Sequence, residues 1–196
     1  AAEQRWYLRA DGGLTTDPPD AGERASEFVY DPADPVPSSS AAAPTASPEP
    51  HGPIDQAAVE ARADVLVFTS EPLANDLEVA GPVRVVVRAQ SSAPSTDWVA
   101  RLCDVHPDGT SYGLCDGILR VARGAGEPSD HEIDLWSTCN VFRRGHRLRV
   151  HVTSSSFPRW DRNLNTGRQG EARYVAARQR IGHDRGRPSW LALTVV

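Results

Sequence analysis

The residues that could carry out chemistry in this chain are a run of serines, six histidines and scattered carboxylates. A serine hydrolase of the α/β class holds its nucleophile in a Gly-x-Ser-x-Gly elbow, a sharp turn that joins a strand to a helix. The run Ser154–Ser156 follows a predicted strand but has no flanking glycines, and we expect the chain to lack the Gly-x-Ser-x-Gly motif. We therefore expect these serines to end a strand, and we expect no catalytic residue in the chain.

The histidines and cysteines lack the spacing of a metal-binding motif. No two histidines stand four residues apart, and the sequence contains neither His-Glu-x-x-His nor Cys-x-x-Cys. The odd number of cysteines argues against a disulfide framework, so we expect buried, inert thiols. We therefore predict no metal site and no cofactor. The residues concerned are His51, His106, His131, His146, His151, His183, Cys103, Cys115 and Cys139.

The composition excludes further kinds of chemistry. All 21 basic residues are arginine, and a chain without lysine can form neither a Schiff base nor a P-loop. The longest wholly apolar runs, such as Val65–Phe68, are far shorter than the roughly 18 residues that a membrane-crossing helix needs. The chain begins with Ala1 and contains no methionine, so we expect a processed or excised piece of a larger protein. We favour a cytoplasmic location, and a homo-oligomer stays open.

Charge is distributed unevenly along the chain. Between Arg143 and Arg187 there are 12 arginines and three acidic residues, whereas the rest of the chain carries 9 arginines and 23 acidic residues. Such a basic segment could bind nucleic acid, but no reader motif accompanies it and the net charge of the chain is -5. We therefore expect no nucleic-acid partner, and we expect this segment to contact acidic parts of the same fold or of a docking surface.

The hydrophobic pattern predicts β-strands throughout the chain. Runs rich in β-branched residues and bounded by proline and glycine occur at Val65–Thr69 and Val83–Arg88. The segment Arg147–Val152 alternates with a period of two, which places its valines and Leu148 inward and His151 outward. Many short strands without a long helical period predict an all-β sandwich or jelly roll.

An Asp-Gly pair between two alternating apolar runs predicts a β-hairpin with Asp108 and Gly109 as its loop. In that register Cys103 lies opposite Leu114. Cys115 then points to the other face of the hairpin, so the two thiols cannot form a disulfide. A one-residue bulge would change this register.

The length of 196 residues fits a single domain, which we divide into three parts. Residues 1–30 are predicted to form short strands and turns that join the sandwich. Residues 31–53 contain seven prolines, which remove backbone donors and fix φ, so we predict a Pro/Ser/Ala-rich extended loop. Residues 54–196 are predicted to form the main β-sandwich.

Several segments resemble, in their order and spacing, the C-terminal domain of the CocE/NonD hydrolases. This group contains cocaine-esterase-like and α-amino-acid-ester-hydrolase-like enzymes and is related to X-Pro dipeptidyl-peptidases. The most specific segment is Ser154–Gly167, with the sequence Ser-Ser-Ser-Phe-Pro-Arg-Trp-Asp-Arg-Asn-Leu-Asn-Thr-Gly. The other matching segments are Trp6–Leu8 with Asp11-Gly12, Tyr30–Pro37, Asp55-Gln56, Arg62–Leu73, Asp97–Leu102, Pro107–Gly109, Ile133–Trp136, Gly145–Arg149 and Pro188–Leu191.

The resemblance implies a jelly-roll β-sandwich of the galactose-binding-domain-like type that follows an α/β-hydrolase domain in the same chain. In the family, the catalytic Ser, Asp and His all belong to that preceding domain. The chain is therefore expected to be a non-catalytic part of a serine hydrolase that acts on a small ester, amide or X-Pro peptide substrate. We expect it to pack on the hydrolase domain and to help shape the substrate pocket.

Two groups of residues are candidates for these contacts. The loop His51-Gly52-Pro53 is a candidate for the substrate pocket, because the corresponding loop of the family approaches the mouth of the active site. The family usually has a Gly-Gly pair where this chain has Ser38–Ala41, so no substrate contact can be transferred directly. The candidates for a polar network, inside the domain or at its docking surface, are Arg159, Trp160, Asp161, Arg162, Asn163 and Asn165.

Two other kinds of protein would use the same residues differently. A free-standing carbohydrate-binding module would use the sandwich to expose Trp98 or Trp160 as a platform on which sugar rings stack. A nucleic-acid-binding or scaffold-binding domain would use the arginine-rich last third, and its binding would depend strongly on salt.

Overall fold

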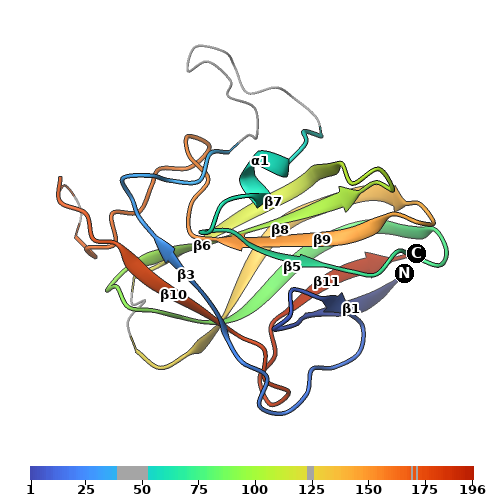
Figure 1. Cartoon of the computed structure of the whole chain (residues 1–196), viewed down its shortest axis with the longest axis horizontal. Helices are drawn as coiled ribbons and strands as arrows, with labels where there is room; N and C mark the ends of the chain where they lie inside the picture. Colours follow the sequence, from blue (N-terminus) through green and yellow to red (C-terminus); the bar gives the residue numbers. More distant parts are fainter. Residues whose placement is uncertain (39–52, 123–125, 169, 171) are drawn as a thin grey trace.

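The computed structural model describes residues 1–38, 53–122, 126–168, 170 and 172–196. These residues form two antiparallel β-sheets that pack face to face around a shared apolar core (Figure 1). The predicted all-β sandwich is therefore confirmed, while the galactose-binding-domain-like relationship stays a prediction. Within these ranges, no helix combines the length and the apolar character that a membrane crossing requires.

The larger sheet is organised around one long strand. Its described strands are β1 (Ala2–Leu8), β2 (Leu14–Thr15), β3 (Ser26–Tyr30), β5 (Leu77–Ser91), β8 (Ser129–Phe142), β10 (Ala177–Gly182) and β11 (Trp190–Val195). β5 pairs with β8 and also with β10 and β11. Beyond β11 the sheet continues through β1 and β2, and beyond β10 it ends at β3.

The smaller sheet has the order β4-β9-β6-β7. Its strands are β4 (Leu66–Thr69), β6 (Thr96–Val105), β7 (Ser111–Val121) and β9 (Arg147–Thr153). The inner face of this sheet contributes Trp98, Leu102 and Val150 to the core, where they meet Val85 and Ile133 of the larger sheet. Each of these five side chains is at most 1% exposed.

The outer face of the smaller sheet is buried as well. Every residue of β6 is buried, although alternate side chains point away from the core. A short helix, α1 (Ala57–Glu60), lies over this face, where Val36, Val59 and Val65 form a second apolar cluster. The polar and thiol side chains buried on this outer face are Asp97, Arg101, Cys103 and His151.

β9 confirms the predicted alternation, because Leu148, Val150 and Val152 join the core. His151 points to the opposite face, as expected, but it is only 2% exposed. The outward direction of His151 is thus confirmed, but that face is not open to solvent, because Glu60 of α1 and Cys103 of β6 lie against His151.

The hairpin between β6 and β7 differs from the predicted register. The pair nearest the loop joins Val105 to Ser111, so the loop has five residues instead of two. Cys103 consequently lies opposite Gly113, and the prediction of Leu114 as its partner is wrong. A bulge at Leu114 restores the predicted register further along, where Leu102 faces Cys115.

The five-residue loop has a local cause. The backbone N–H of His106 donates to the carbonyl of Thr110, the Asp108 carboxylate accepts from the Thr110 N–H, and Gly109 adopts a φ of +91°.

All three cysteines are free thiols. The expectation that they are buried is confirmed for Cys103 but wrong for Cys139, which is exposed on β8, and for Cys115, which is half-buried.

Candidate functional site

The loop after β9 is fastened to the rest of the fold through Asn163. Its Nδ2 donates to Ser95 Oγ at 3.0 Å and to Asp97 Oδ1 at 2.9 Å. Its Oδ1 accepts the backbone N–H of Asn165 at 2.9 Å, and its backbone carbonyl accepts the Tyr30 hydroxyl at 3.0 Å. Because these polar groups are buried and paired with one another, they hold the loop in a defined conformation.

Asp97 is the buried acid of this network, at 1% exposure. Its two carboxylate oxygens accept hydrogen bonds from Arg120 of β7, from Nε at 2.9 Å and from Nη2 at 2.8 Å. Burial, followed by the nearby charge of Asp97, raises the pKa of Tyr30, so its hydroxyl stays a neutral donor. Sequence reasoning missed Asp97 as a network residue, although an acid beside the strongly apolar run of β6 was an available signal.

Asp161 and Arg162 lie at the exposed rim of the same loop. Asp161 contributes its backbone carbonyl, which accepts Arg120 Nη2 at 3.0 Å, and Arg162 Nη1 donates to the carbonyl of Pro32 at 2.8 Å. These contacts lie within the domain, and the buried carboxylate among them is Asp97 and not Asp161.

Arg159 and Trp160 belong to an adjacent group of contacts. The Arg159 guanidinium lies 5.0 Å from the centroid of the Trp160 ring, and Arg159 Nε lies 3.3 Å from Asp116 Oδ1. The other oxygen of Asp116 accepts Arg101 Nη2 at 3.1 Å, and the same nitrogen donates to the carbonyl of Ser38. The structure thus connects the loop, β6, β7 and the start of the Pro/Ser/Ala-rich segment.

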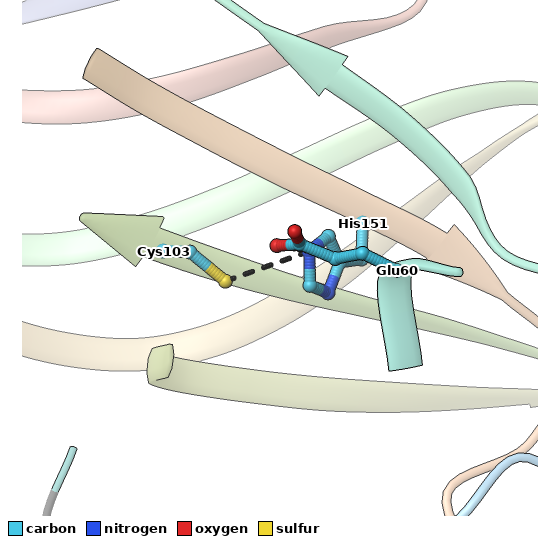
Figure 2. Close-up of side chains that lie close together, drawn as sticks. All are labelled: Glu60, Cys103 and His151. Carbon is cyan, nitrogen blue, oxygen red and sulfur yellow. Dashed lines mark hydrogen bonds and ion pairs between the residues drawn. The ribbon is translucent and has the colours of Figure 1, made fainter. Parts of the chain in front are cut away.

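A second buried polar cluster lies where α1 meets the smaller sheet (Figure 2). His151 Nε2 lies 2.9 Å from Glu60 Oε1 and 3.7 Å from Cys103 Sγ. Glu60 Oε2 accepts a hydrogen bond from Arg149 Nη1 at 2.5 Å. Burial alone would lower the pKa of His151, but Cys103 and Glu60 outweigh it and raise the pKa to about 9. Three side chains with metal-ligating atoms therefore converge from α1, β6 and β9.

A third cluster joins the β6–β7 loop to the turn before β9. His146 Nδ1 lies 2.9 Å from Asp104 Oδ1, and His106 Nε2 lies 3.8 Å from Asp104 Oδ2. The two imidazole rings stand 4.3 Å apart between centroids. Folding thus brings together two histidines that are distant in the sequence, a proximity that spacing rules could not detect.

The spacing Gly-x-Ser-x-Gly does occur in the chain, at Gly109–Gly113, and the structure shows why it is not a nucleophile elbow. The segment lies in the hairpin between β6 and β7, so it joins two strands and not a strand to a helix. Its central Ser111 is 1% exposed. A hydroxyl in this position cannot reach a substrate carbonyl.

The structure describes only one residue of the predicted pocket loop. His51 and Gly52 lie outside the described residues, and Pro53 is exposed just before α1.

Among the tryptophans proposed as stacking platforms for sugar rings, Trp98 is 1% exposed and therefore excluded. Trp160 is half-buried, and the highly exposed Trp136, at 71%, was not predicted as a candidate.

Four large apolar side chains are exposed on β3 and on the loop that follows β9. Phe157 begins this loop, Tyr174 and Val175 end it, and Val29 lies on β3, the edge strand that pairs with β10. Their exposures are between 42% and 56%. We call Val29, Phe157, Tyr174 and Val175 together the loop-end face; Phe157 belongs to the Ser154–Gly167 segment, and the other three lie outside it.

Known proteins match the chain over nearly its full length. The model of the X-Pro dipeptidyl-peptidase C-terminal non-catalytic domain matches residues 1–192. Cocaine esterase from Rhodococcus sp. (strain MB1 Bresler) is 38% identical over 199 residues, which cover 94% of this chain and 34% of the esterase. A putative serine esterase from Mycobacterium bovis is 28% identical over 183 residues, which cover 79% of this chain and 29% of that protein. The chain therefore spans about a third of the length of these relatives.

Solved structures agree with this assignment. An alpha-amino acid ester hydrolase is 31% identical with a TM-score of 0.86, and the match covers 100% of this chain and 36% of the hydrolase. An aminopeptidase from a marine sediment archaeon of the Thaumarchaeota is 29% identical with a TM-score of 0.90, covering 100% of this chain and 37% of that protein. The resemblance to the C-terminal domain of the CocE/NonD hydrolases is thus confirmed, and the chain belongs to the family of X-Pro dipeptidyl-peptidase C-terminal non-catalytic domains.

Proposed function

We propose that this domain packs against an α/β-hydrolase domain of the same polypeptide and helps to shape the substrate pocket of that domain. The observation that carries the proposal is the loop-end face. Its apolar side chains are exposed on β3 and on a loop that Asn163 fastens to the rest of the domain. An apolar surface on a rigid frame is suited to burial against a neighbouring domain.

The position of the Pro/Ser/Ala-rich segment supports a role at the pocket. The backbone N–H of Ser38 donates to the carbonyl of Phe157 at 2.8 Å, so the first described part of the segment, residues 31–38, reaches the loop-end face. The segment returns at Pro53, just before α1. A segment that reaches the docking face can also reach the mouth of a pocket in the neighbouring domain, and we propose that His51, Gly52 and Pro53 contact substrate there.

The names of the relatives suggest the substrate class. They are an esterase, an ester hydrolase and an aminopeptidase, which all act on an acyl group bonded to oxygen or nitrogen. We propose that the parent of this domain is a serine hydrolase for a small ester, amide or X-Pro peptide. Its nucleophile then belongs to the hydrolase domain, because the family to which this chain belongs is non-catalytic.

Docking is tested by removing apolar area from the loop-end face of the full-length parent. The double substitution Phe157→Ser with Tyr174→Ser should lower the melting temperature of the parent and raise KM for an aryl ester. It should leave the melting temperature of the isolated 196-residue chain nearly unchanged, because both side chains are exposed there. Trp136→Ser, on β8, is the matched control for loss of an exposed aromatic side chain. An unchanged melting temperature and an unchanged KM in the parent would reject the docking proposal.

The pocket contribution is tested separately with His51→Ala in the full-length parent. We expect KM for ester substrates to change by more than twofold while the melting temperature stays the same. Equal values of KM and kcat for the variant and the unmodified enzyme, across several acyl groups, would show that the loop does not contact substrate.

A further inference from the structure

We propose that Glu60, Cys103 and His151 form a zinc-binding site that fastens α1 to the smaller sheet. Figure 2 shows the three side chains converging from α1, β6 and β9. Thiolate, imidazole and carboxylate are the three ligand types that protein zinc sites use. The absence of a spacing motif does not argue against this site, because its ligands come from three separate elements.

The donor atoms already stand near the separations of a tetrahedral site. With metal bonds of about 2.0 Å to nitrogen or oxygen and about 2.3 Å to sulfur, neighbouring ligand atoms lie about 3.3–3.6 Å apart. Here His151 Nε2 lies 3.7 Å from Cys103 Sγ and 2.9 Å from Glu60 Oε1, and all three donors lie within 4.8 Å of one another. To admit the ion, the Glu60 carboxylate must move a few tenths of an ångström away from His151 Nε2 while its oxygen comes to about 3.5 Å from Cys103 Sγ.

The surroundings orient these ligands. Arg149 Nη1 holds Glu60 Oε2, which leaves Oε1 to face the ion. Cys103 and His151 are at most 2% exposed, whereas the side chain of Glu60 is 14% exposed. Two ligands are thus fixed within the sheet, and the third, at the edge of the site, provides the side from which an ion enters.

The charges near the site are compatible with a divalent cation. The groups that face His151 are the acidic Glu60, the Cys103 thiol, and the guanidinium groups of Arg149 and Arg101. Arg101 is neutralised by Asp116. Zinc binds the thiolate form of cysteine and the unprotonated nitrogen of histidine, so its binding to Cys103 and His151 displaces the protons that these atoms carry.

An ion at this position would hold the cover of the smaller sheet in place. Glu60 is the last residue of α1, whose Val59 packs with Val36 and Val65 over the outer face. Zinc binding would therefore stabilise the packing of α1 on the smaller sheet, together with the residues between Pro53 and α1. The proposal does not depend on docking to a hydrolase domain, since all three ligands belong to this chain.

The test uses the 196-residue chain after treatment with a chelator and titration with ZnCl₂ or CoCl₂. We expect one ion per chain, a rise in melting temperature with zinc, and a thiolate-to-cobalt charge-transfer band with cobalt. Cys103→Ala and His151→Gln should each remove the band and weaken zinc binding by at least about 100-fold. Arg149→Gln, which removes the partner of Glu60 and a hydrogen bond to Thr69, should weaken binding by about 10-fold.

Two control variants distinguish this site from other metal-binding groups. Cys139→Ala removes the exposed thiol, and His106→Gln removes a ligand of the Asp104–His106–His146 cluster. Neither should alter the cobalt band or the zinc affinity. The proposal is overturned if the unmodified chain gives no thiolate band, if Cys103→Ala retains it, or if either control removes it. Circular dichroism of each variant in the presence of the chelator establishes that it is folded without metal. If Cys103→Ala does not fold, His151→Gln provides the test in its place.

Discussion

The side-chain amide of Asn163 donates a hydrogen bond of 2.9 Å to the carboxylate of Asp97, and this bond joins the loop after β9 to strand β6. Asp97 is 1% exposed and Asn163 is 8% exposed. A buried carboxylate is tolerated only where donors surround it, and here Asn163 and Arg120 supply them. The loop that carries the most specific family sequence is thus held by a residue about 60 positions earlier in the chain.

Asp97→Ala should lower the free energy of unfolding by about 2–4 kcal/mol. The substitution leaves the buried amide of Asn163 without one of its acceptors and removes the partner of Arg120. Asp161→Ala should cost less than about 1 kcal/mol, since the Asp161 side chain is exposed and contributes its backbone carbonyl. Urea unfolding of both variants measures the difference, and equal losses would show that Asp97 does not anchor the loop.

Gly117→Ala should be among the most damaging small substitutions in the chain. A Cβ atom at position 117 of β7 would lie 1.9 Å from the carbonyl oxygen of Asp134 in β8, where the edges of the two sheets meet. We expect a loss of about 2–4 kcal/mol or failure to fold, because backbone must move to relieve the clash. Gly22→Ala is the control: the glycine has a φ of +78° in open space, so only about 1–2 kcal/mol of backbone strain is expected. Thermal melting of both variants measures the difference. A smaller drop in melting temperature for Gly117→Ala than for Gly22→Ala would contradict this account.

The three thiols should differ in reactivity toward an alkylating reagent. Cys139 is exposed and should react at once in the native chain. Burial, reinforced by the charge of Asp116, raises the pKa of Cys115 to about 12, so this thiol stays protonated at neutral pH and should react only after unfolding. Cys103 is 0% exposed and should be protected in the same way. Mass spectrometry of the native chain checks this, and early labelling of Cys115 would be inconsistent with its position.

Acid should weaken the fold partly through Glu23. Burial alone would raise the pKa of Glu23, but hydrogen bonds from Arg9 and from the backbone N–H groups of Asp20 and Ala10 lower it from 4.5 to about 2. Because the folded pKa lies below the unfolded value, this carboxylate contributes its full stability above about pH 4.5 and loses it as the pH falls to about 2.

Glu23→Gln should therefore be less stable than the unmodified chain at neutral pH by about 1–3 kcal/mol, and the difference should shrink as the pH approaches 2. Denaturant unfolding at several pH values measures it. A constant difference over this range would mean that the Glu23 charge does not act in this way.

The sequence predicted the strands better than it predicted the polar contacts. The period-two alternation in Arg147–Val152 identified the core face correctly, since side-chain direction follows directly from strand geometry. It could not show that α1 would cover the other face and bury His151, because that contact joins residues about 90 positions apart. For the same reason, the matching segment identified the correct loop, but the buried acid that holds it, Asp97, lies on another strand.

Turn chemistry limited the prediction of register. The Asp-Gly pair at positions 108 and 109 located the hairpin correctly, but hydrogen bonds between His106 and Thr110 extend the loop to five residues. The bulge at Leu114 then compensates, so that the register near Cys103 differs from the prediction while that at Cys115 agrees with it.

Hydrogen–deuterium exchange tests the central proposal, docking through the loop-end face, most directly. The measurement compares the full-length parent with the isolated 196-residue chain, at the backbone amides around Phe157 and at Tyr174 and Val175. We predict slower exchange at these positions in the parent, with unchanged exchange around the exposed Trp136 on β8. Equal exchange at the loop-end face in the two proteins would contradict the proposal that this surface packs on the hydrolase domain.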